Sequence, residues 1–191
     1  MGVPHTPLAA PVKIYYLTQA AFWIHQVLIL NAEAHRKDHY QMLSHHVITI
    51  FLVYASYALH YTRVGCLILV LMDFCDILLA LAKMLKYLEL PVAPDVTFVT
   101  FLVSWLFTRH VGYIWILKSV WYDLPRLRPN ILDPSKVEYP PTLTPTHYYT
   151  FRALLFSLQI IMLSWFTAII KVALSVVRGK PAEDTRSDDE G

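Results

Sequence analysis

Charge is scarce in this 191-residue chain: lysine plus arginine number 16 and aspartate plus glutamate 14, so that 16% of the residues are charged. An average soluble domain has about 25%. The net charge of +2 excludes a polybasic nucleic-acid binder and an acidic disordered protein. Aromatic residues make up 14% of the sequence, which excludes disorder of the whole chain. The few charges matter because a bilayer makes each of them unfavourable.

Cysteine is nearly absent as well, since the chain contains only Cys66 and Cys75, and no internal repeat is visible. The two cysteines stand nine positions apart in one apolar stretch, on opposite faces of a helix. They cannot form a disulfide with each other, and they provide no cysteine framework for a metal site.

Proline is missing from the long apolar runs, because the twelve prolines lie in clusters between them. Five of the runs have about the 17–25 residues that a helix needs to cross roughly 30 Å of hydrocarbon: 14–33, 43–60, 64–85, 96–118 and 153–177. Backbone groups in lipid must bond within their own segment, and the alternating strands of a barrel are absent. The sequence therefore predicts an all-α, polytopic transmembrane helix bundle with about five spans.

The segments outside the runs differ in character. The connection 61–63 is so short that the second and third spans should form a tight antiparallel hairpin. Segment 119–152 holds six of the twelve prolines and is predicted to be an extended, irregular loop. A short segment, 1–11, precedes the first span. The end, 179–191, is predicted to be a disordered acidic cytosolic tail, where Ser187 suits an acidophilic kinase or the segment serves solubility alone.

Three aromatic pairs at the span edges are typical of the membrane interface: Tyr15–Tyr16, Trp121–Tyr122 and Tyr148–Tyr149. The distribution of lysine and arginine favours a cytosolic C-terminus by a small margin. An odd number of spans after a bare Met1 predicts that upstream sequence is missing.

A polar stripe runs along the second predicted span. At 100° per residue, four side chains share one face, and His46 samples the adjacent face. The four are His45, Thr49, Ser56 and His60. Such a stripe should face protein or water rather than lipid.

Two carboxylates lie near the middle of the third span, where an isolated one is unfavourable by about 3 kcal/mol. Asp73 and Asp76 share a face, which Lys83 continues. Counted outward from the hairpin, Asp76 lies about 6 Å deeper than His46, so that the sequence predicts one intramembrane cavity shared by two histidines and two aspartates. A carboxylate beside an imidazole can fix its tautomer, as a general base or nucleophile requires.

Two other interpretations stay open. The polar residues of the second and third spans can simply hydrogen-bond the helices to one another. Alternatively, four histidines form part of a metal site. His35, His39, His45 and His46 follow the pattern H-x3-H-x5-H-H, which is similar to the histidine boxes of membrane di-iron hydroxylases. Those enzymes need further ligands in several boxes, and no H-x2-H-H box occurs here.

Polar residues of two further spans can reach the same cavity. The first span carries a stripe that either lines the cavity or forms a packing seam: Tyr15, Gln19, Trp23, Gln26 and Glu33. In the fourth span, Arg109 is a deep cation that can neutralise the aspartates or meet an anionic group of a ligand.

Several of these residues stand in runs that resemble the ceramide synthase family. One run leads into the histidines: Glu33-Ala34-His35-Arg36-Lys37-Asp38-His39, then Met42, His45-His46 and Thr49. Another is similar to the family's longevity-assurance motif: Arg63-Val64-Gly65, then Leu71-Met72-Asp73, Asp76 and Ala82-Lys83-Met84. The pattern Tyr-x3-Gln-x3-Trp-x2-Gln from Tyr15 fits as well. The resemblance covers 12–178 and is greatest to the fungal branch.

The resemblance implies a TLC-type transmembrane domain over 12–178, in a multi-pass protein of the endoplasmic reticulum membrane. It implies a sphingosine N-acyltransferase, which moves a fatty acyl group from acyl-CoA to the amine of a sphingoid base. His45 is then the nucleophile or base, with an acyl-histidine intermediate, His46 is its neighbour, and Asp73 and Asp76 support the pair. Substrate binding is expected from Gln19, Trp23, Gln26, Lys83 and Arg109.

The same resemblance sets the expected partners. Acyl-CoA is a co-substrate, and no metal or other cofactor is expected. The cations placed to meet the CoA head are Arg36, Lys37 and Lys86, although these also fit a positive-inside role. The expected partners are the lipid bilayer and a second ceramide synthase chain or small accessory subunit, with no nucleic acid.

The sequence departs from the family in three ways. Members have further spans upstream, and some animal members carry a homeobox-like insert; neither is present here. His35 stands where the family often has arginine. The sequence therefore also fits an N-terminally truncated or inactive paralogue, a subunit of a heteromer, or a non-enzymatic TLC-type protein that senses or traffics lipids.

Overall fold

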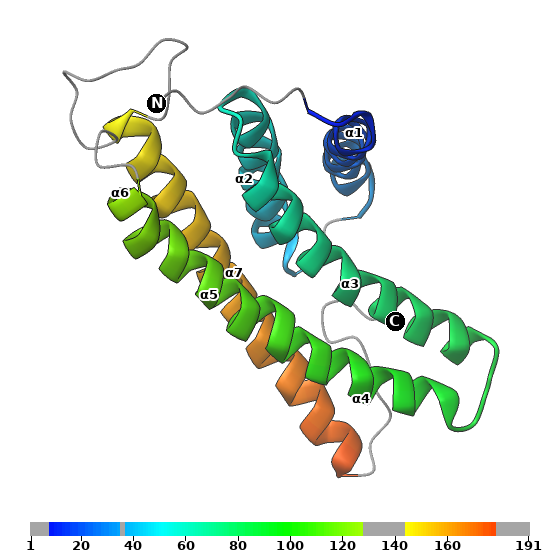
Figure 1. Cartoon of the computed structure of the whole chain (residues 1–191). Coiled ribbons are helices and arrows are strands. Elements are labelled where there is room, and N and C mark those ends of the chain that lie inside the picture. The colour runs from blue at the N-terminus through cyan, green and yellow to red at the C-terminus, as the bar shows by residue number, and fades with distance from the viewer. Residues whose placement is uncertain (1–7, 35–36, 128–143, 179–191) are drawn as a thin grey trace. The chain divides into compact units, whose positions relative to one another are not determined.

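The computed structural model describes residues 8–34, 37–127 and 144–178, and the regular structure within these ranges is helical throughout (Figure 1). The all-α prediction is confirmed. The helices are α1 (Ala10–Ala32), α2 (His39–Ala58), α3 (Thr62–Tyr87), α4 (Ala93–Trp105), α5 (Tyr113–Lys118), α6 (Leu124–Leu127) and α7 (Pro145–Val177). Two π-helical segments, Leu106–Gly112 and Ser119–Asp123, connect α4, α5 and α6 into one helical run.

Prolines mark the beginnings of three helices. Pro11, Pro94 and Pro145 each occupy one of the first two positions of α1, α4 and α7. Proline fits there because the first backbone N–H groups of a helix have no partner within it and because its φ angle is already helical. The clusters of proline therefore separate the helices, as the apolar runs predict.

The chain forms two compact units that divide within α3, after Cys66. In the first unit, α1 packs against α2. In the second, α7 lies beside the run from α4 to α6, which Figure 1 shows in yellow to orange beside green. The connection from α2 to α3 is short, as predicted, and His60 within it adopts a left-handed φ of 61°.

Two helices of the described ranges are long and apolar enough to cross a membrane by length and composition: α3, over Thr62–Tyr87, and α7, over Pro145–Val176. They overlap the predicted spans 64–85 and 153–177, although α7 begins earlier than predicted. The shorter α1 and α2 carry more polar residues, and π-helical segments divide the run that begins with α4.

The predicted loop over 119–152 is wrong at both ends, because the helical run continues to Leu127 and α7 begins at Pro145. Pro125 does not end the run even though it has no backbone N–H to donate within the helix. The hydroxyl of Tyr148 on α7 donates to the carbonyl of Trp121, four residues before Pro125, at 3.2 Å. The middle of the predicted loop lies outside the described residues, as do 1–7 of the N-terminal segment and the tail over 179–191 with Ser187.

A capping box sets the start of α7. The hydroxyl of Thr144 accepts a hydrogen bond from the backbone N–H of His147 at 3.3 Å, and the His147 ring accepts one from the backbone N–H of Thr144 at 3.4 Å. Two of the unpaired N–H groups at this helix end are thereby satisfied. The helix begins before the apolar run because of this cap.

Replacement of Thr144 tests how much the cap contributes to the stability of the protein. Thr144→Ala is expected to lower the free energy of unfolding by about 1 kcal/mol, because a Ser or Thr cap contributes about that much. Thermal unfolding in detergent, with hydrogen exchange of the first turn of α7, measures the effect. Thr146→Ala is the matched control, since Thr146 is exposed in the same turn, and equal losses in both variants would contradict the capping role.

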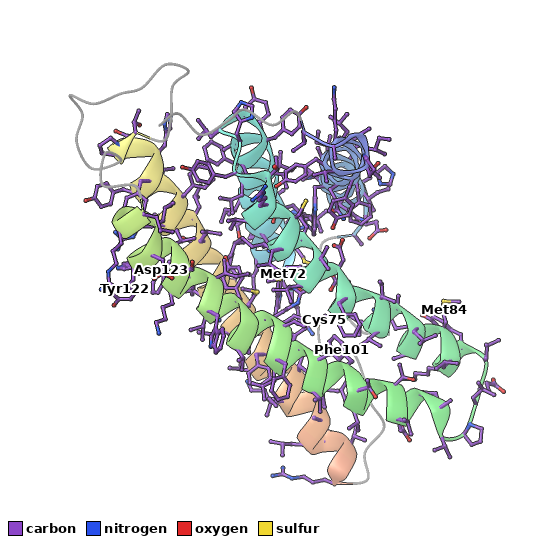
Figure 2. The ribbon with its side chains drawn as sticks, viewed as in Figure 1. Met72, Cys75, Met84, Phe101, Tyr122 and Asp123 are labelled. Atoms are coloured by element: carbon purple, nitrogen blue, oxygen red, sulfur yellow. The ribbon has the colours of Figure 1, made fainter. Side chains whose placement is uncertain are left out.

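The aromatic pairs divide between the surface and the interior. Tyr16 and Tyr148 are buried, each 1% exposed, so the prediction that they belong to an interfacial belt is wrong for these two side chains. Trp121 and Tyr122 are exposed at the α6 end of the second unit, where Figure 2 labels Tyr122. Tyr149 is exposed as well. Hydrogen bonds to the carbonyls of other segments account for the burial of the two hydroxyls.

Candidate active site

The polar stripe predicted for the second span is largely the buried face of α2. His45, His46, Thr49 and Ser56 are all buried, and the hydroxyl of Thr49 donates to the carbonyl of His45 at 2.8 Å. His60 differs from the prediction, because α2 ends at Ala58 and His60 lies exposed in the connection that follows. The two adjacent histidines are thus buried side chains.

Trp23 of α1 packs against both histidines. Its ring centroid lies 5.5 Å from that of His45 at 75° and 5.3 Å from that of His46 at 51°. The two imidazoles lie 5.6 Å apart. Trp23 is itself only 7% exposed, so that the three rings form one buried cluster, the histidine–tryptophan cluster.

Two polar atoms of this cluster retain hydrogen-bonding capacity. Within the part of the chain that the structure describes, neither Nδ1 of His46 nor Nε1 of Trp23 has a hydrogen-bond partner, and both atoms are buried. Such a group is costly to bury without a partner. An imidazole nitrogen held in this way is chemically suited to accept a proton or attack a carbonyl carbon.

Tyr16 lies on the same face of α1 as Trp23, seven residues before it. The contacts of its side chain fix the position of this helix. Its hydroxyl donates to the carbonyl of Thr62 at 3.1 Å and lies 3.3 Å from Oγ of Ser56. Gly65 makes room for it, since a Cβ on Gly65 would collide with the Tyr16 hydroxyl and lie 3.1 Å from Oγ of Ser56. A glycine is therefore required at this position of the Arg63-Val64-Gly65 run, because a larger residue would collide with Tyr16 within the first unit.

Gly65→Ala tests this close approach. The added methyl group is expected to lower the free energy of unfolding by about 1–3 kcal/mol, as overpacking of an interior does, because Tyr16 is 1% exposed and cannot move freely. Thermal unfolding of the purified variants measures this loss of stability. Tyr16→Phe, which lacks the colliding hydroxyl, should recover part of the loss in the double variant.

Gly112→Ala is the matched control. A Cβ there would lie 3.2 Å from the carbonyl oxygen of Phe107 and 3.6 Å from Cδ1 of Leu71, so that a smaller loss is expected. Equal losses at Gly65 and Gly112, or no recovery with Tyr16→Phe, would count against the close approach as the cause.

An ion pair lies inside the second unit. Nη2 of Arg109 donates to Oδ1 of Asp76 at 2.6 Å and to the carbonyl of Met72 at 3.1 Å. The guanidinium also stacks over the ring of Trp105, with Cζ 4.4 Å from its centroid, and the arginine is 3% exposed. The prediction that Arg109 neutralises a carboxylate of the third span is confirmed.

The seam between α3 and α4 carries further polar contacts next to this pair. The buried Cys75, labelled in Figure 2 with Met72 and Phe101, has its Sγ 2.9 Å from the hydroxyl of Thr108 and 3.7 Å from that of Ser104. Cys66 and Cys75 are both free thiols, as their spacing predicts. These contacts hold α3 to the π-helical segment that carries Arg109.

The other predicted site residues take varied positions. Gln19 is half-buried and donates to the hydroxyl of Tyr15 at 3.3 Å, and Gln26 is half-buried on α1. Asp73 is half-buried and Lys83 exposed on α3. The aspartates belong to the second unit and the histidines to the first, so that the shared cavity stays a prediction. His35 lies outside the described residues, within which no cluster of three metal-ligating side chains occurs.

One buried polar pair escapes prediction from the sequence. His110, next to Arg109, has its Nδ1 2.9 Å from Nε2 of Gln159 on α7. Both side chains are buried, at 7% and 6% exposure. The signal that could have revealed the pair is a lone glutamine in the apolar run of α7, since polar side chains in such runs face partners.

Comparison with known proteins places this chain in a family. The family model described as the TLC domain matches residues 2–171. The chain belongs to the TLC-domain family. The match includes both histidines, both aspartates and Arg109, and ends within α7.

Curated relatives give the likeness more detail. The chain is 39% identical to the sphingosine N-acyltransferase-like protein ALT7 of Alternaria alternata, over 99% of the chain and 50% of that protein. It is 40% identical to the ceramide synthase FUM18 of Gibberella moniliformis, over 97% of the chain and 49% of the relative. It is also 40% identical to the sphingosine N-acyltransferase lag1 of Schizosaccharomyces pombe, over 94% of the chain and 45% of that protein. The chain thus spans about half the length of these curated relatives.

Proposed function

We propose that this TLC-domain chain acts in sphingosine N-acylation, transferring a fatty acyl group from acyl-CoA to the amine of a sphingoid base. The observation that carries the proposal is the buried histidine–tryptophan cluster, in which Nδ1 of His46 has no hydrogen-bond partner among the described residues. The names of the three relatives support the same reaction. Acyl transfer needs an activated nucleophile or base shielded from water, and this cluster offers one.

The proposed reaction has two steps. An imidazole nitrogen of the pair attacks the thioester carbonyl carbon, the C–S bond breaks, and CoA leaves as the thiolate. The amine of the sphingoid base then attacks the acyl carbon, the amide C–N bond forms, and the imidazole leaves with its electron pair. The base enters as an ammonium and loses two protons, of which one converts the thiolate to the thiol and the other is released. An imidazole that acts only as the base for direct attack of the amine gives the same products.

The remaining assignments follow the sequence predictions. Asp73 and Asp76 are proposed to support the imidazoles and attract the ammonium, with Asp76 held in place by Arg109. Gln19, Gln26 and Trp23 of α1, with Lys83 and Arg109, are proposed to bind substrate. Lys37 and Lys86, with Arg36, are proposed to meet the CoA head.

We also propose that α1, α2 and the run from α4 to α5 cross the membrane together with α3 and α7, in the endoplasmic reticulum. Support comes from the large apolar side chains that α1 and α2 expose, among them Ile14, Leu28, Phe51 and Val47. Contiguous exposed apolar surface marks contact with a membrane or another protein. A second ceramide synthase chain or a small accessory subunit is the proposed partner.

The test is an assay of the full chain in microsomes from a host that lacks its own ceramide synthases. Palmitoyl-CoA and dihydrosphingosine should give dihydroceramide, detected by mass, and omission of either substrate should abolish the product. Microsomes without the chain set the background. Product no higher than that background, from a chain shown to be inserted in the membrane, would overturn the proposal.

A further inference from the structure

An arginine and three aromatic side chains gather in the second unit, where the π-helical segment Ser119–Asp123 meets the first turns of α7. The guanidinium of Arg152 stacks on the ring of Trp121, with Cζ 3.4 Å from the ring centroid. Its Cζ also lies 5.1 Å from the ring centroid of Tyr148 and 5.7 Å from that of Tyr149. These four residues are called the arginine–aromatic cluster, and none of them takes part in the proposed reaction.

The contacts of this cluster fix the orientation of the guanidinium. Nη1 of Arg152 donates to the hydroxyl of Tyr148 at 3.3 Å, and the same hydroxyl donates to the carbonyl of Trp121 at 3.2 Å. Tyr148 is 1% exposed, so that its hydroxyl cannot move freely. The ring of Trp121 holds one face of the guanidinium while Tyr148 holds one of its nitrogens, and the cation is therefore oriented before any ligand arrives.

The hydrogen bonding of Arg152 is incomplete. A guanidinium has five N–H donors, and the bond to Tyr148 is the only hydrogen bond that its side chain makes with the described residues. Nε is buried without a partner in the same ranges. Asp123, which Figure 2 labels at this end of the run, is exposed and forms no ion pair with the arginine. Aromatic rings attract a cation but do not neutralise it as an anion does.

The charge around the cluster favours an anionic ligand. Residues 118–127 and 144–152 contain one acidic side chain, Asp123, and three basic ones: Lys118, Arg126 and Arg152. The lysine and Arg126 are exposed. A guanidinium binds phosphate or carboxylate groups through charge-assisted hydrogen bonds, whereas the ammonium of a choline head would be repelled by the surrounding cations.

The position of Arg152 along α7 corresponds to the headgroup level of a membrane. The turns before it are rich in polar and aromatic residues, and the apolar run 153–177 follows it directly. Trp121 and Tyr149 of the cluster are exposed, as is the adjacent Tyr122, and exposed Trp and Tyr are typical of the membrane interface. A long basic side chain at such a place extends toward the lipid phosphates.

An apolar path for an acyl chain begins at the same arginine. Three large apolar side chains of α7 follow it at steps of four, four and three residues, and each is about half exposed: Phe156, Ile160 and Leu163. At 100° per residue they lie within about 80° of Arg152, on one face of the helix. A ligand with both a phosphate and acyl chains therefore fits this face better than a soluble anion.

We propose that the arginine–aromatic cluster binds the phosphate of an anionic glycerophospholipid. Nη2 of Arg152 donates to the phosphate, the ring of Trp121 supports the guanidinium, and an acyl chain lies along Phe156 and Ile160. The site lies within the second unit, roughly three helical turns beyond Arg109 along the run from α4 to α6. It goes beyond the proposed acyl transfer and does not depend on it.

Native mass spectrometry of the full chain in detergent tests this proposal, with occupancy of the first bound lipid as the readout. The chain is titrated with phosphatidylinositol, phosphatidylcholine and diacylglycerol of identical acyl chains. Phosphatidylinositol should bind about fivefold more tightly than phosphatidylcholine, the effect of one basic side chain on an anionic lipid, and about tenfold more tightly than diacylglycerol, which lacks the phosphate. Arg152→Gln should reduce both ratios to below about twofold.

The ratios separate recognition from folding, because a variant that merely loosens the bundle weakens all three lipids together. Arg126→Gln is the matched control, since it removes the same charge from an exposed position at the same end, and it should keep at least about half of each ratio. Equal binding of the three lipids by the unmodified chain, or unchanged ratios in Arg152→Gln, would overturn the proposal. Equal losses in the two variants would assign the preference to surface charge alone, and displacement of the lipid by millimolar inorganic phosphate would assign the site to a soluble anion; either result contradicts a lipid site built by the cluster.

Discussion

His45→Ala and His46→Ala are each expected to abolish ceramide formation, with a loss of at least about 10³-fold, while the chain stays inserted in the membrane. Removing a nucleophile removes the first step of the reaction, and removing a positioned base costs about 10²–10⁴-fold. Both rings touch Trp23 in the buried cluster, so that loss of either imidazole also changes the packing of the other. Initial rates in the microsomal assay, normalised to the amount of inserted chain, give the result.

Controls separate chemistry from packing. His25→Ala removes an exposed histidine of α1 and should leave the rate within a factor of about two. His46→Asn and His46→Gln keep a hydrogen-bonding side chain but supply no nucleophile or base, and should be as inactive as alanine. Near-normal rates in both alanine variants would remove the histidine pair from the mechanism, whatever the source of the activity.

Arg109→Met is expected to destabilise the second unit by about 3 kcal/mol. The substitution keeps much of the volume of the side chain but leaves the carboxylate of Asp76 without its cation, in a helix long and apolar enough to cross a membrane. Breaking a paired charge in such a setting costs about 3–5 kcal/mol, and the half-exposed side chain of Asp76 places the expected value at the lower end. The loss of stability is measured by unfolding the purified protein in mixed micelles with increasing amounts of dodecyl sulfate.

A second substitution identifies the cause. Asp76→Asn in the Arg109→Met background removes the unpaired charge and should recover more than half of the loss. Arg126→Met is the matched control, because Arg126 is exposed on α6, and its effect should stay within about 0.5 kcal/mol. If the double variant is no more stable than Arg109→Met, the loss comes from packing over Trp105 and the carbonyl of Met72, and the charge explanation is wrong.

The sequence alone predicts the five long helical runs and the buried histidine pair. It does so because low charge and proline-free apolar stretches leave the backbone few alternatives in lipid. The pairing of Arg109 with a carboxylate of the third span also follows from elementary electrostatics, since a deep cation requires a partner. The first two features depend on composition and on spacing within one helix, whereas the third depends on the rule that a deep charge needs a partner.

Helix boundaries near the prolines could not be predicted in this way. Pro125 argues for a loop by every local rule, but the helical run continues to Leu127, and the hydroxyl of Tyr148, from another helix, bonds the carbonyl of Trp121 in this stretch. In the same way, the depth of Tyr16 depends on Gly65 and on the carbonyl of Thr62, which are far from it in the chain. Contacts between distant segments override the local signal.

What the sequence by itself determined is the chemistry available to this TLC-domain chain: a histidine pair, two aspartates and one deep arginine in an apolar, helical protein. Only the tertiary structure decided which of these groups meet. It brought Trp23 onto the histidines, Arg109 onto Asp76 and His110 onto Gln159. The physical reason lies partly in the π-helical segment Leu106–Gly112, whose wider turn changes the angular step between residues. A helical wheel drawn at 100° per residue loses its phase there, and the faces of Arg109 and His110 can be known only from the folded chain.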